Sequence, residues 1–248
     1  MSETNHVAGR RFIIVGLPRS GTTYLMSLLN SHKSVICAGE LFNPYSVIET
    51  GPPDFDLNRV FERDWGPRYF MKQFFDRHEA EPWERIGFKL MLGHNIRVMS
   101  FLPEMPDVPI IYVHRHNRLA QVASYLKAVQ TKKWAQTRKS IDMRRKIVAS
   151  PQMISHQWHE YATMDFLFEN WLKTLPQRSM TVEYCDMFKP GFNESLCAFL
   201  QIAHDPKMKS PLVKQGANRV LDRFEAPDPI EAYMRCVGRP GWLENELP

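Results

Sequence analysis

The stretch FIIVGLPRSGTTYL, residues 12–25, constrains the fold more than any other part of this 248-residue chain. Four apolar residues favour a buried strand, a short loop follows, and the last residues favour the start of a helix. Gly16 and Gly21 have the spacing of a phosphate-binding P-loop, G-x-x-x-x-G-K-[ST]. A strand, such a loop and a helix in this order predict an anion site at the helix N-terminus.

The loop lacks the lysine of that motif. Thr22 stands in its place, and an arginine, Arg19, lies inside the loop. A nucleoside triphosphatase needs the lysine on its terminal phosphates and a hydroxyl on Mg²⁺. A loop with Arg19, the hydroxyls of Thr22 and Thr23 and backbone N–H groups still suits a tetrahedral anion, whereas it suits a magnesium triphosphate poorly.

Two segments carry a resemblance to a known family. The run Pro18-Arg19-Ser20-Gly21-Thr22-Thr23 resembles the 5′-phosphosulfate loop of sulfotransferases that use 3′-phosphoadenosine 5′-phosphosulfate (PAPS). The longer sequence through Gly39-Glu40-Leu41-Phe42-Asn43-Pro44 is most similar to the bacterial carbohydrate-type branch, which includes trehalose and nodulation-factor sulfotransferases. The resemblance implies that the loop binds the donor, with Arg19 at the transferred group, and that Glu40 is the general base. Tyr24, which follows Thr23, stands where cytosolic members have a tryptophan that stacks on adenine, although a packing residue in the first helical turn fits equally well.

The alternation of apolar strands and helices predicts an α/β fold, a P-loop-type parallel β-sheet flanked by helices on both faces. We expect strands at residues 12–15, 34–37, 86–91, 110–113 and 180–184. Helices are expected at residues 22–30, 66–77, 117–129, about 140–175 with a break near 150–151, and before residue 202. Residues 43–64 are expected to be irregular, within an acceptor-side excursion at about 43–85, and the chain after residue 202 to be a proline-dotted tail. The length suits a single domain, residues 1–248.

Candidate ligands for the donor lie after other predicted strands, because such sheets bind ligands at the carboxyl ends of their strands. Arg115 follows the strand at 110–113, and Ser124 lies off the apolar stripe of the next helix. The resemblance places both on the 3′-phosphate of the donor, and arginine offers a planar fork of donors to a phosphate. Arg118 is the alternative to Arg115. Glu40 follows the short second strand, where a carboxylate can accept the proton of an attacking hydroxyl.

Further candidates rest on shorter matches. Tyr184 opens a segment that resembles the Tyr-Glu-Asp segment of the family, in which the tyrosine contacts adenine. Lys214 belongs to a Lys-Gln-Gly sequence that resembles an element closing over the 3′-phosphate. Lys89 ends a strand and suits a role in steadying the transferring group, although a solvated lysine fits equally well. His156 and His159 have a spacing that metal ligands use, but without a third ligand we favour packing or the lining of an acceptor pocket.

Composition narrows the class of protein only slightly. The net charge of +5 favours an anionic ligand, a membrane surface or a nucleic acid, and PAPS alone accounts for it. The four cysteines form no C-x-x-C pair and are interpreted as free thiols in a reducing compartment. A polar N-terminus without a signal peptide and the lack of a long apolar run favour a cytoplasmic protein.

The sequence therefore predicts an enzyme that transfers a sulfuryl group from PAPS to a hydroxyl of a small molecule, carbohydrate or glycolipid. Sulfuryl carries less charge than phosphoryl, so fixed donors suffice and no divalent ion is expected. A homodimer fits the resembled branch, although no residue indicates one. The alternatives are a P-loop kinase of a small metabolite and a non-catalytic protein that binds anions or nucleic acid. No nucleic-acid partner is expected, because the basic residues are not interleaved with aromatic ones in any recognised module.

Overall fold

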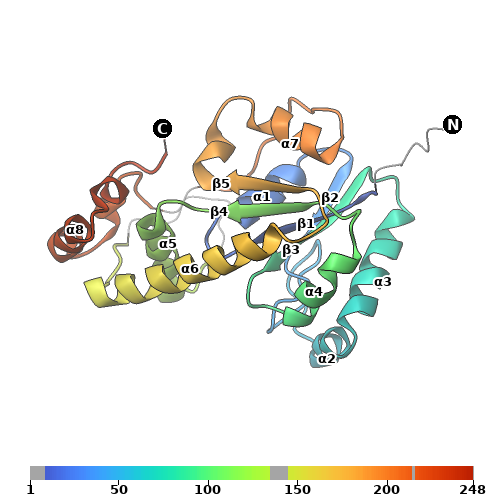
Figure 1. Ribbon diagram of the computed structural model, residues 1–248, viewed down its shortest axis with the longest axis horizontal. Coiled ribbons are helices and arrows are strands. Elements are labelled where there is room, and N and C mark those ends of the chain that lie inside the picture. Colours follow the sequence, from blue (N-terminus) through green and yellow to red (C-terminus); the bar gives the residue numbers. More distant parts are fainter. Residues whose placement is uncertain (1–8, 135–144, 214–215, 248) are drawn as a thin grey trace.

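The computed structural model describes residues 9–134, 145–213 and 216–247, and within them a single parallel sheet forms the centre of the protein (Figure 1). Its strands are β1 (Arg11–Gly16), β2 (Val35–Ala38), β3 (Arg85–Met91), β4 (Ile110–His114) and β5 (Ser179–Glu183). Their order across the sheet is β2-β3-β1-β4-β5, and every neighbouring pair is parallel. The predicted α/β class and strand positions are confirmed.

Helices cover both faces of this sheet (Figure 1). They are α1 (Thr22–Leu29), α2 (Leu57–Trp65), α3 (Pro67–Glu79), α4 (Ile96–Phe101), α5 (Arg118–Thr131), α6 (Pro151–Leu172), α7 (Phe192–Leu200) and α8 (Pro227–Cys236). Alternate residues of β1 explain why both faces are buried. Ile13 and Val15 join the core under α3, α5 and α6, whereas Phe12 and Ile14 join the core under α1 and α7. Strands that are buried on both faces read as continuous apolar runs, which is what made them recognisable in the sequence.

Residues 43–64 were expected to be irregular, and this expectation is wrong for the last part, where α2 forms. The helix begins at a capped N-terminus, because the Asp56 side chain accepts a hydrogen bond from the backbone N–H of Asn58. It is also held by Arg63, which is only 1% exposed. A helix with a buried arginine does not present the apolar inner face on which sequence-based assignment relies.

The position of Arg63 leaves the apolar side of α2 facing outward. Its guanidinium donates hydrogen bonds to the carbonyl oxygens of residues 41, 43 and 46, in the segment that follows β2. On the opposite side of the helix, Leu57 and Phe61 are each 63% exposed and Trp65 is 88% exposed. The segment after β2 is therefore anchored by a polar interaction rather than by an apolar helix face.

Two other expectations need correction. The helix expected at about 140–175 begins only at Pro151, and residues 145–150 are not helical; residues 140–144 lie outside the described part of the chain. Ile147 instead pairs with Phe224, and Ser150 caps α6 by accepting the backbone N–H of Met153. The predicted break at 150–151 is thus the helix start.

The segment after residue 202 is more than a tail, because it contains α8. The one-turn spacing of Ile230 and Met234 buries both side chains fully, and α8 packs on α6. Short 3₁₀ helices flank it at Leu221–Arg223 and Pro240–Leu243. The C-terminal segment therefore covers the same end of the molecule as the start of α6 (Figure 1).

Candidate active site

The loop between β1 and α1 is a tight turn whose shape depends on its glycines. A Cβ at Gly16 would lie 2.7 Å from the carbonyl oxygen of Val113 and 2.7 Å from the methyl carbon of Thr22. Gly21 has a φ of +112°, which favours glycine. Arg19 also has a positive φ, +65°, an uncommon conformation for a residue with a side chain. The two glycines that defined the motif are thus required by steric fit and by backbone conformation.

The N-terminus of α1, where this loop ends, suits an anion. Gly21 is the N-cap residue of α1 and has no side chain with which to cap the helix. The first N–H groups of a helix are therefore directed outward, at its positive end. The hydroxyl of Ser20 is fully buried beside them and has no hydrogen-bond partner among the described residues. A buried hydroxyl of this kind calls for a partner, and an oxygen of a tetrahedral anion in the loop would satisfy it.

The two threonines of the loop have different surroundings. Thr22 is buried and its hydroxyl contacts the sulfur of Met91, so any contact of Thr22 with the donor is expected through its backbone N–H. The hydroxyl of Thr23 accepts a hydrogen bond from the Lys89 ammonium, with a Nζ to Oγ1 distance of 2.7 Å. Pro18 contributes its carbonyl oxygen, which accepts a bond from Gln121 on α5. The loop is thus tied to β3 and to α5.

Arg19 and Ser124, two predicted donor ligands that are 105 positions apart in the sequence, are in contact. The Nε of Arg19 donates to the Ser124 hydroxyl at 2.8 Å, and its Nη1 donates to the carbonyl oxygen of Trp134. Burial and the neighbouring Arg115 lower the pKa of Arg19 to about 10, so the guanidinium is charged at neutral pH. A half-buried, charged guanidinium beside the loop adds to the attraction for an anion.

Of the two arginines considered after β4, Arg115 is the one that reaches the loop. Its Nη1 donates to the carbonyl oxygen of Arg19 at 2.9 Å, and its guanidinium lies 4.3 Å from the ring centroid of Tyr184. Arg118 instead pairs with Asp165, a buried carboxylate of α6. The geometry therefore favours Arg115 over Arg118 as the ligand of the 3′-phosphate, a role that stays a prediction.

The predicted adenine contacts, Tyr184 and Tyr24, lie beside the loop in one aromatic group. A Cβ on Gly21 would come within 2.6 Å of the Tyr184 ring, so the ring of Tyr184 packs closely against Gly21 of the loop. Phe188 joins them, with ring centroids 4.8 Å from Tyr24 and 5.2 Å from Tyr184. Lys214, the last predicted donor ligand, lies outside the described residues.

Glu40 lies at the carboxyl edge of the sheet, connected to α1 through Lys89. Its Oε1 is 2.9 Å from the Lys89 Nζ, and its Oε2 accepts a hydrogen bond from the Asn43 amide at 2.7 Å. The Nε2 of His94 is 4.0 Å from the same Oε2. Burial by itself would raise the pKa of Glu40, but Lys89 and Asn43 outweigh it and the pKa is lowered. Glu40 is therefore an ionised carboxylate at neutral pH.

Three contributors to this site were missed or underrated in the sequence. Lys89 fitted a solvated lysine equally well, yet it is only 4% exposed and contacts Glu40 and Thr23. His94 and Glu246 belong to no motif. Glu246 pairs with Arg115 across 131 positions of sequence, and no local pattern reports a contact at that separation.

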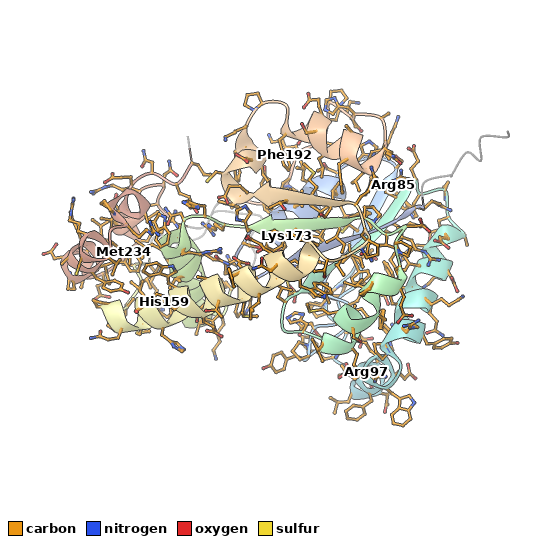
Figure 2. All side chains as sticks on the ribbon, viewed as in Figure 1. Arg85, Arg97, His159, Lys173, Phe192 and Met234 are labelled. Atoms are coloured by element: carbon orange, nitrogen blue, oxygen red, sulfur yellow. The ribbon has the colours of Figure 1, made fainter. Side chains whose placement is uncertain are left out.

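The two histidines of α6 gather no metal-binding set. The ring of His159 stacks on Trp158, with centroids 4.7 Å apart, toward the end of the molecule that holds α8 (Figure 2). Within the described ranges, no three His, Cys, Asp or Glu side chains are grouped as metal ligands would be. None of the helices described has both the length and the apolarity that a membrane span requires.

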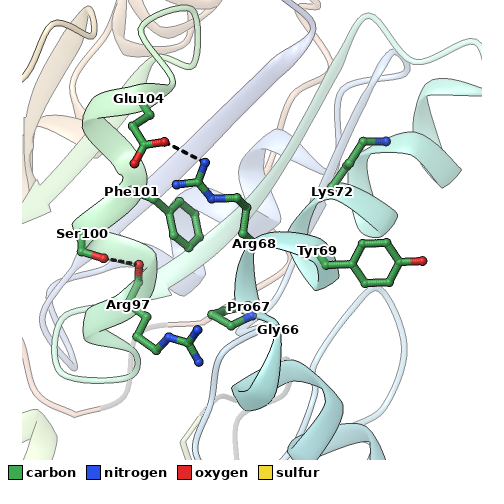
Figure 3. Close-up of a pocket in the computed structure, with 9 residues that line it drawn as sticks. All are labelled: Gly66, Pro67, Arg68, Tyr69, Lys72, Arg97, Ser100, Phe101 and Glu104. Carbon is green, nitrogen blue, oxygen red and sulfur yellow. Dashed lines mark hydrogen bonds and ion pairs between the residues drawn. The ribbon is translucent and has the colours of Figure 1, made fainter.

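A separate hollow of about 540 Å³ opens between the start of α3 and α4 (Figure 3). Arg68 and Phe101 lie in it, with the guanidinium 4.9 Å from the ring centroid. Arg68 also pairs with Glu104 across the hollow at 2.7 Å. Among the described residues, no predicted donor ligand lines it, so this hollow is distinct from the candidate donor site.

The fold and the site define a class: a P-loop-type α/β protein whose loop suits an anion but lacks the lysine of nucleoside triphosphatases. Residues 11–206 match the sequence profile of the Sulfotransferase family. The chain belongs to that family, as the loop motif predicted. Nodulation protein H of Rhizobium meliloti strain 1021 is 32% identical over 126 residues, which are 50% of this chain and 49% of that protein. The chain thus spans about half the length of the curated relatives it matches.

Solved sulfotransferase structures share the fold at low sequence identity. The sulfotransferase domain of the Synechococcus PCC 7002 olefin synthase aligns with a TM-score of 0.50 at 13% identity, over 94% of this chain and 90% of that one. Sulfotransferase STF9 from Mycobacterium avium also aligns with a TM-score of 0.50, at 11% identity, over 97% and 79% of the two chains. At these identities the likeness concerns the fold alone.

Proposed function

We propose that this protein transfers a sulfuryl group from PAPS to a hydroxyl of an acceptor, a carbohydrate or a glycolipid. The observation that carries the proposal is the chain of contacts from Glu40 through Lys89 to Thr23. It connects an ionised carboxylate to the first turn of α1, where the loop suits an anion. A proton acceptor and an anion site at one edge of a sheet are what transfer to a hydroxyl requires. The resemblance to the carbohydrate-type branch is the reason for the choice of acceptor.

The loop residues are proposed to hold the 5′-phosphosulfate. Backbone N–H groups at the start of α1, including those of Thr22 and Thr23, point toward its oxygens, and the Ser20 hydroxyl donates to one of them. Arg19 and Lys89 offset the negative charge that gathers on the oxygen bridging sulfur and phosphorus as that bond breaks. Donors that are fixed before the reaction stabilise such charge without reorganising.

The other end of the donor is assigned to residues that lie around the loop. Arg115 and Ser124 are proposed to bind the 3′-phosphate, together with Lys214, whose part follows from sequence alone. Tyr184 and Tyr24 are proposed to contact the adenine. Their position against the loop and near Phe188 supports this assignment, because a group of aromatic rings suits contact with a flat base.

In the transfer itself, the acceptor oxygen attacks sulfur in line with the leaving oxygen. A bond from the acceptor oxygen to sulfur forms, the bond from sulfur to the bridging oxygen breaks, and 3′,5′-adenosine bisphosphate leaves. Glu40 accepts the hydroxyl proton. Because Lys89 lowers the pKa of Glu40, the carboxylate is a weak base at the outset, and the proton moves as the attacking oxygen becomes acidic.

The substitution Glu40→Gln tests this proposal. We expect it to lower the rate of transfer from labelled PAPS to a panel of hydroxylated sugars by about 10²-fold, the usual scale for a lost general base. Binding of 3′,5′-adenosine bisphosphate should be retained. Glu49→Gln is the matched control, because Glu49 belongs to the same segment and is equally exposed, at 20%, but pairs with Arg59 and Arg77. Undiminished transfer by the Glu40 variant would rule out its role, and tight binding of ATP–Mg²⁺ without the bisphosphate would favour a kinase.

A further inference from the structure

Glu246, near the C-terminal end of the described chain, holds a fully enclosed carboxylate between two arginines. Its side chain is 0% exposed. One oxygen accepts a hydrogen bond from the Nε of Arg115 at 2.5 Å, and the other accepts one from the Nη2 of Arg223 at 2.6 Å. The Nη2 of Arg115 also pairs with the first oxygen. This carboxylate thus bridges a predicted donor ligand and a residue of the C-terminal segment.

Stability alone does not explain the burial of this charged carboxylate, as its energetic cost shows. Removing charges from water is costly, and a buried ion pair adds little net stability compared with apolar residues of similar volume. What it does provide is a fixed geometry, because an arginine paired along one edge of its planar fork loses its freedom to rotate. The contact is therefore better explained by the orientation of Arg115 than by stability.

The contacts of Arg115 indicate what that orientation serves. The edge formed by Nε and Nη2 faces Glu246, while Nη1 donates to the Arg19 carbonyl oxygen in the loop. The plane of the guanidinium lies over the ring of Tyr184. These contacts, from different parts of the chain, thus fix the guanidinium of Arg115 with its Nη1 toward the loop.

Glu246 is itself held in place by the backbone around it. Its N–H donates to the carbonyl oxygen of Asn218 at 3.0 Å, and the Asn218 side chain bonds both backbone groups of Leu247. The Cys185 thiol contacts the carbonyl oxygen of Glu246 at 3.1 Å. On the other side, Arg223 donates to the carbonyl oxygen of Ala217. The carboxylate is therefore fixed before any ligand binds.

We propose that Glu246 is a positioning residue of the donor site, which orients Arg115 toward the 3′-phosphate of the nucleotide. This inference rests on the proposed function. The charge balance supports it, since Arg115 lies close enough to repel both Arg19 and Arg223 and, after burial, contributes to the lowered pKa of each. One carboxylate offsets part of that repulsion and leaves a net positive charge for a phosphate.

The test compares two nucleotides that differ at the 3′ position. Isothermal titration calorimetry on the full chain measures 3′,5′-adenosine bisphosphate, which has the 3′-phosphate, and adenosine 5′-monophosphate, which lacks only that group. We expect Glu246→Gln to weaken binding of the bisphosphate by about tenfold, as for a disturbed buried charge pair, and to leave binding of the monophosphate unchanged. Glu246→Asp, which keeps the charge, should restore part of the difference. Glu244→Gln is the control, because Glu244 is 62% exposed and lies 3.8 Å from Arg219.

Other results would overturn the inference. Equal weakening of both nucleotides, together with a lower melting temperature, would mean that Glu246 only supports the fold. Tighter binding of the bisphosphate by the Gln variant would mean that the carboxylate competes with the phosphate instead of positioning its ligand. If the wild-type protein binds neither nucleotide, or both equally well, the assignment of the donor site itself fails. The wild-type titration therefore separates a failure of the proposed function from a failure of this inference alone.

Discussion

Replacing Lys89 by methionine is the perturbation that tests the active-site electrostatics most directly. Lys89 is 4% exposed, its ammonium lies 2.9 Å from Glu40 and 2.7 Å from Thr23, and methionine preserves most of its apolar length. Removing one partner of a buried ion pair costs about 3–5 kcal/mol. Glu40 keeps its Asn43 contact and is 20% exposed, so we expect the lower end, about 3 kcal/mol at pH 7.

The effect of Lys89→Met on stability should depend on pH, and the direction follows from the pKa of Glu40. In the wild type the pKa of Glu40 is lowered, so its stabilising contribution is present above the ordinary glutamate pKa and is lost as the pH falls. Without Lys89, burial dominates and raises the pKa above the ordinary value. The carboxyl then prefers to be protonated when folded, and the loss of stability grows as the pH rises from 4 to 7. The acid limb of the activity profile should move to higher pH for the same reason.

Urea denaturation at pH 4, 5, 6 and 7 measures the stability difference, and the pH profile of sulfuryl transfer measures the acid limb. Lys72→Met is the matched control, since Lys72 pairs with Asp76 on the surface of α3 and is 65% exposed; we expect it to change stability by less than about 0.5 kcal/mol. A difference between wild type and Lys89→Met that does not vary with pH, or an acid limb that stays in place, would refute the coupling of Lys89 to Glu40.

Two further predictions concern the scaffold of the site. Gly16→Ala places a Cβ 2.7 Å from the Val113 carbonyl oxygen, so we expect the loop to distort. The affinity for 3′,5′-adenosine bisphosphate, measured by calorimetry, should fall by about tenfold or more. Wild-type affinity in this variant would show that the loop accommodates the added methyl group. Arg63→Leu removes the donors to the carbonyl oxygens of Leu41 and Ser46 and leaves these buried groups unpaired. The free energy of unfolding, measured in urea, should fall by about 3 kcal/mol. Arg59→Leu is the control, because the Arg59 side chain is 37% exposed. A loss no larger than that of the control would mean that water replaces Arg63.

The parts of the fold that could be predicted from sequence are those with a local cause. The strands were recognisable because both of their faces are buried, and the loop was recognisable because Gly16 and Gly21 meet local steric needs. The start of α6 also had a local signal, the Ser150-Pro151 pair that caps it. Helix α2 had such a signal in Asp56, but most apolar residues of that helix face solvent and only Val60 is buried, so the pattern does not point to a core.

The residues of the candidate site likewise fall into those with a local signal in the sequence and those without one. Arg19, Arg115 and Glu40 could be named as candidates because each lies after a predicted strand, where parallel sheets bind ligands, and because the resemblance to the family implies a role for each. The buried state of Lys89 could not be predicted, because it depends on Glu40 arriving from another strand. The role of Glu246 could not be predicted either, because only the complete tertiary structure brings its partners Arg115 and Arg223 to it.

The contact between Arg115 and Glu246 also has a consequence for the order in which the protein matures. During translation the chain emerges from its N-terminal end, so the loop and Arg115 leave the ribosome well before the segment that carries Glu246. Until that segment arrives, the guanidinium lacks the carboxylate against which it rests in the finished protein. A nascent chain can therefore form most of its sheet while the proposed nucleotide site is still incomplete, and the site is completed only after the segment around Glu246 has been synthesised.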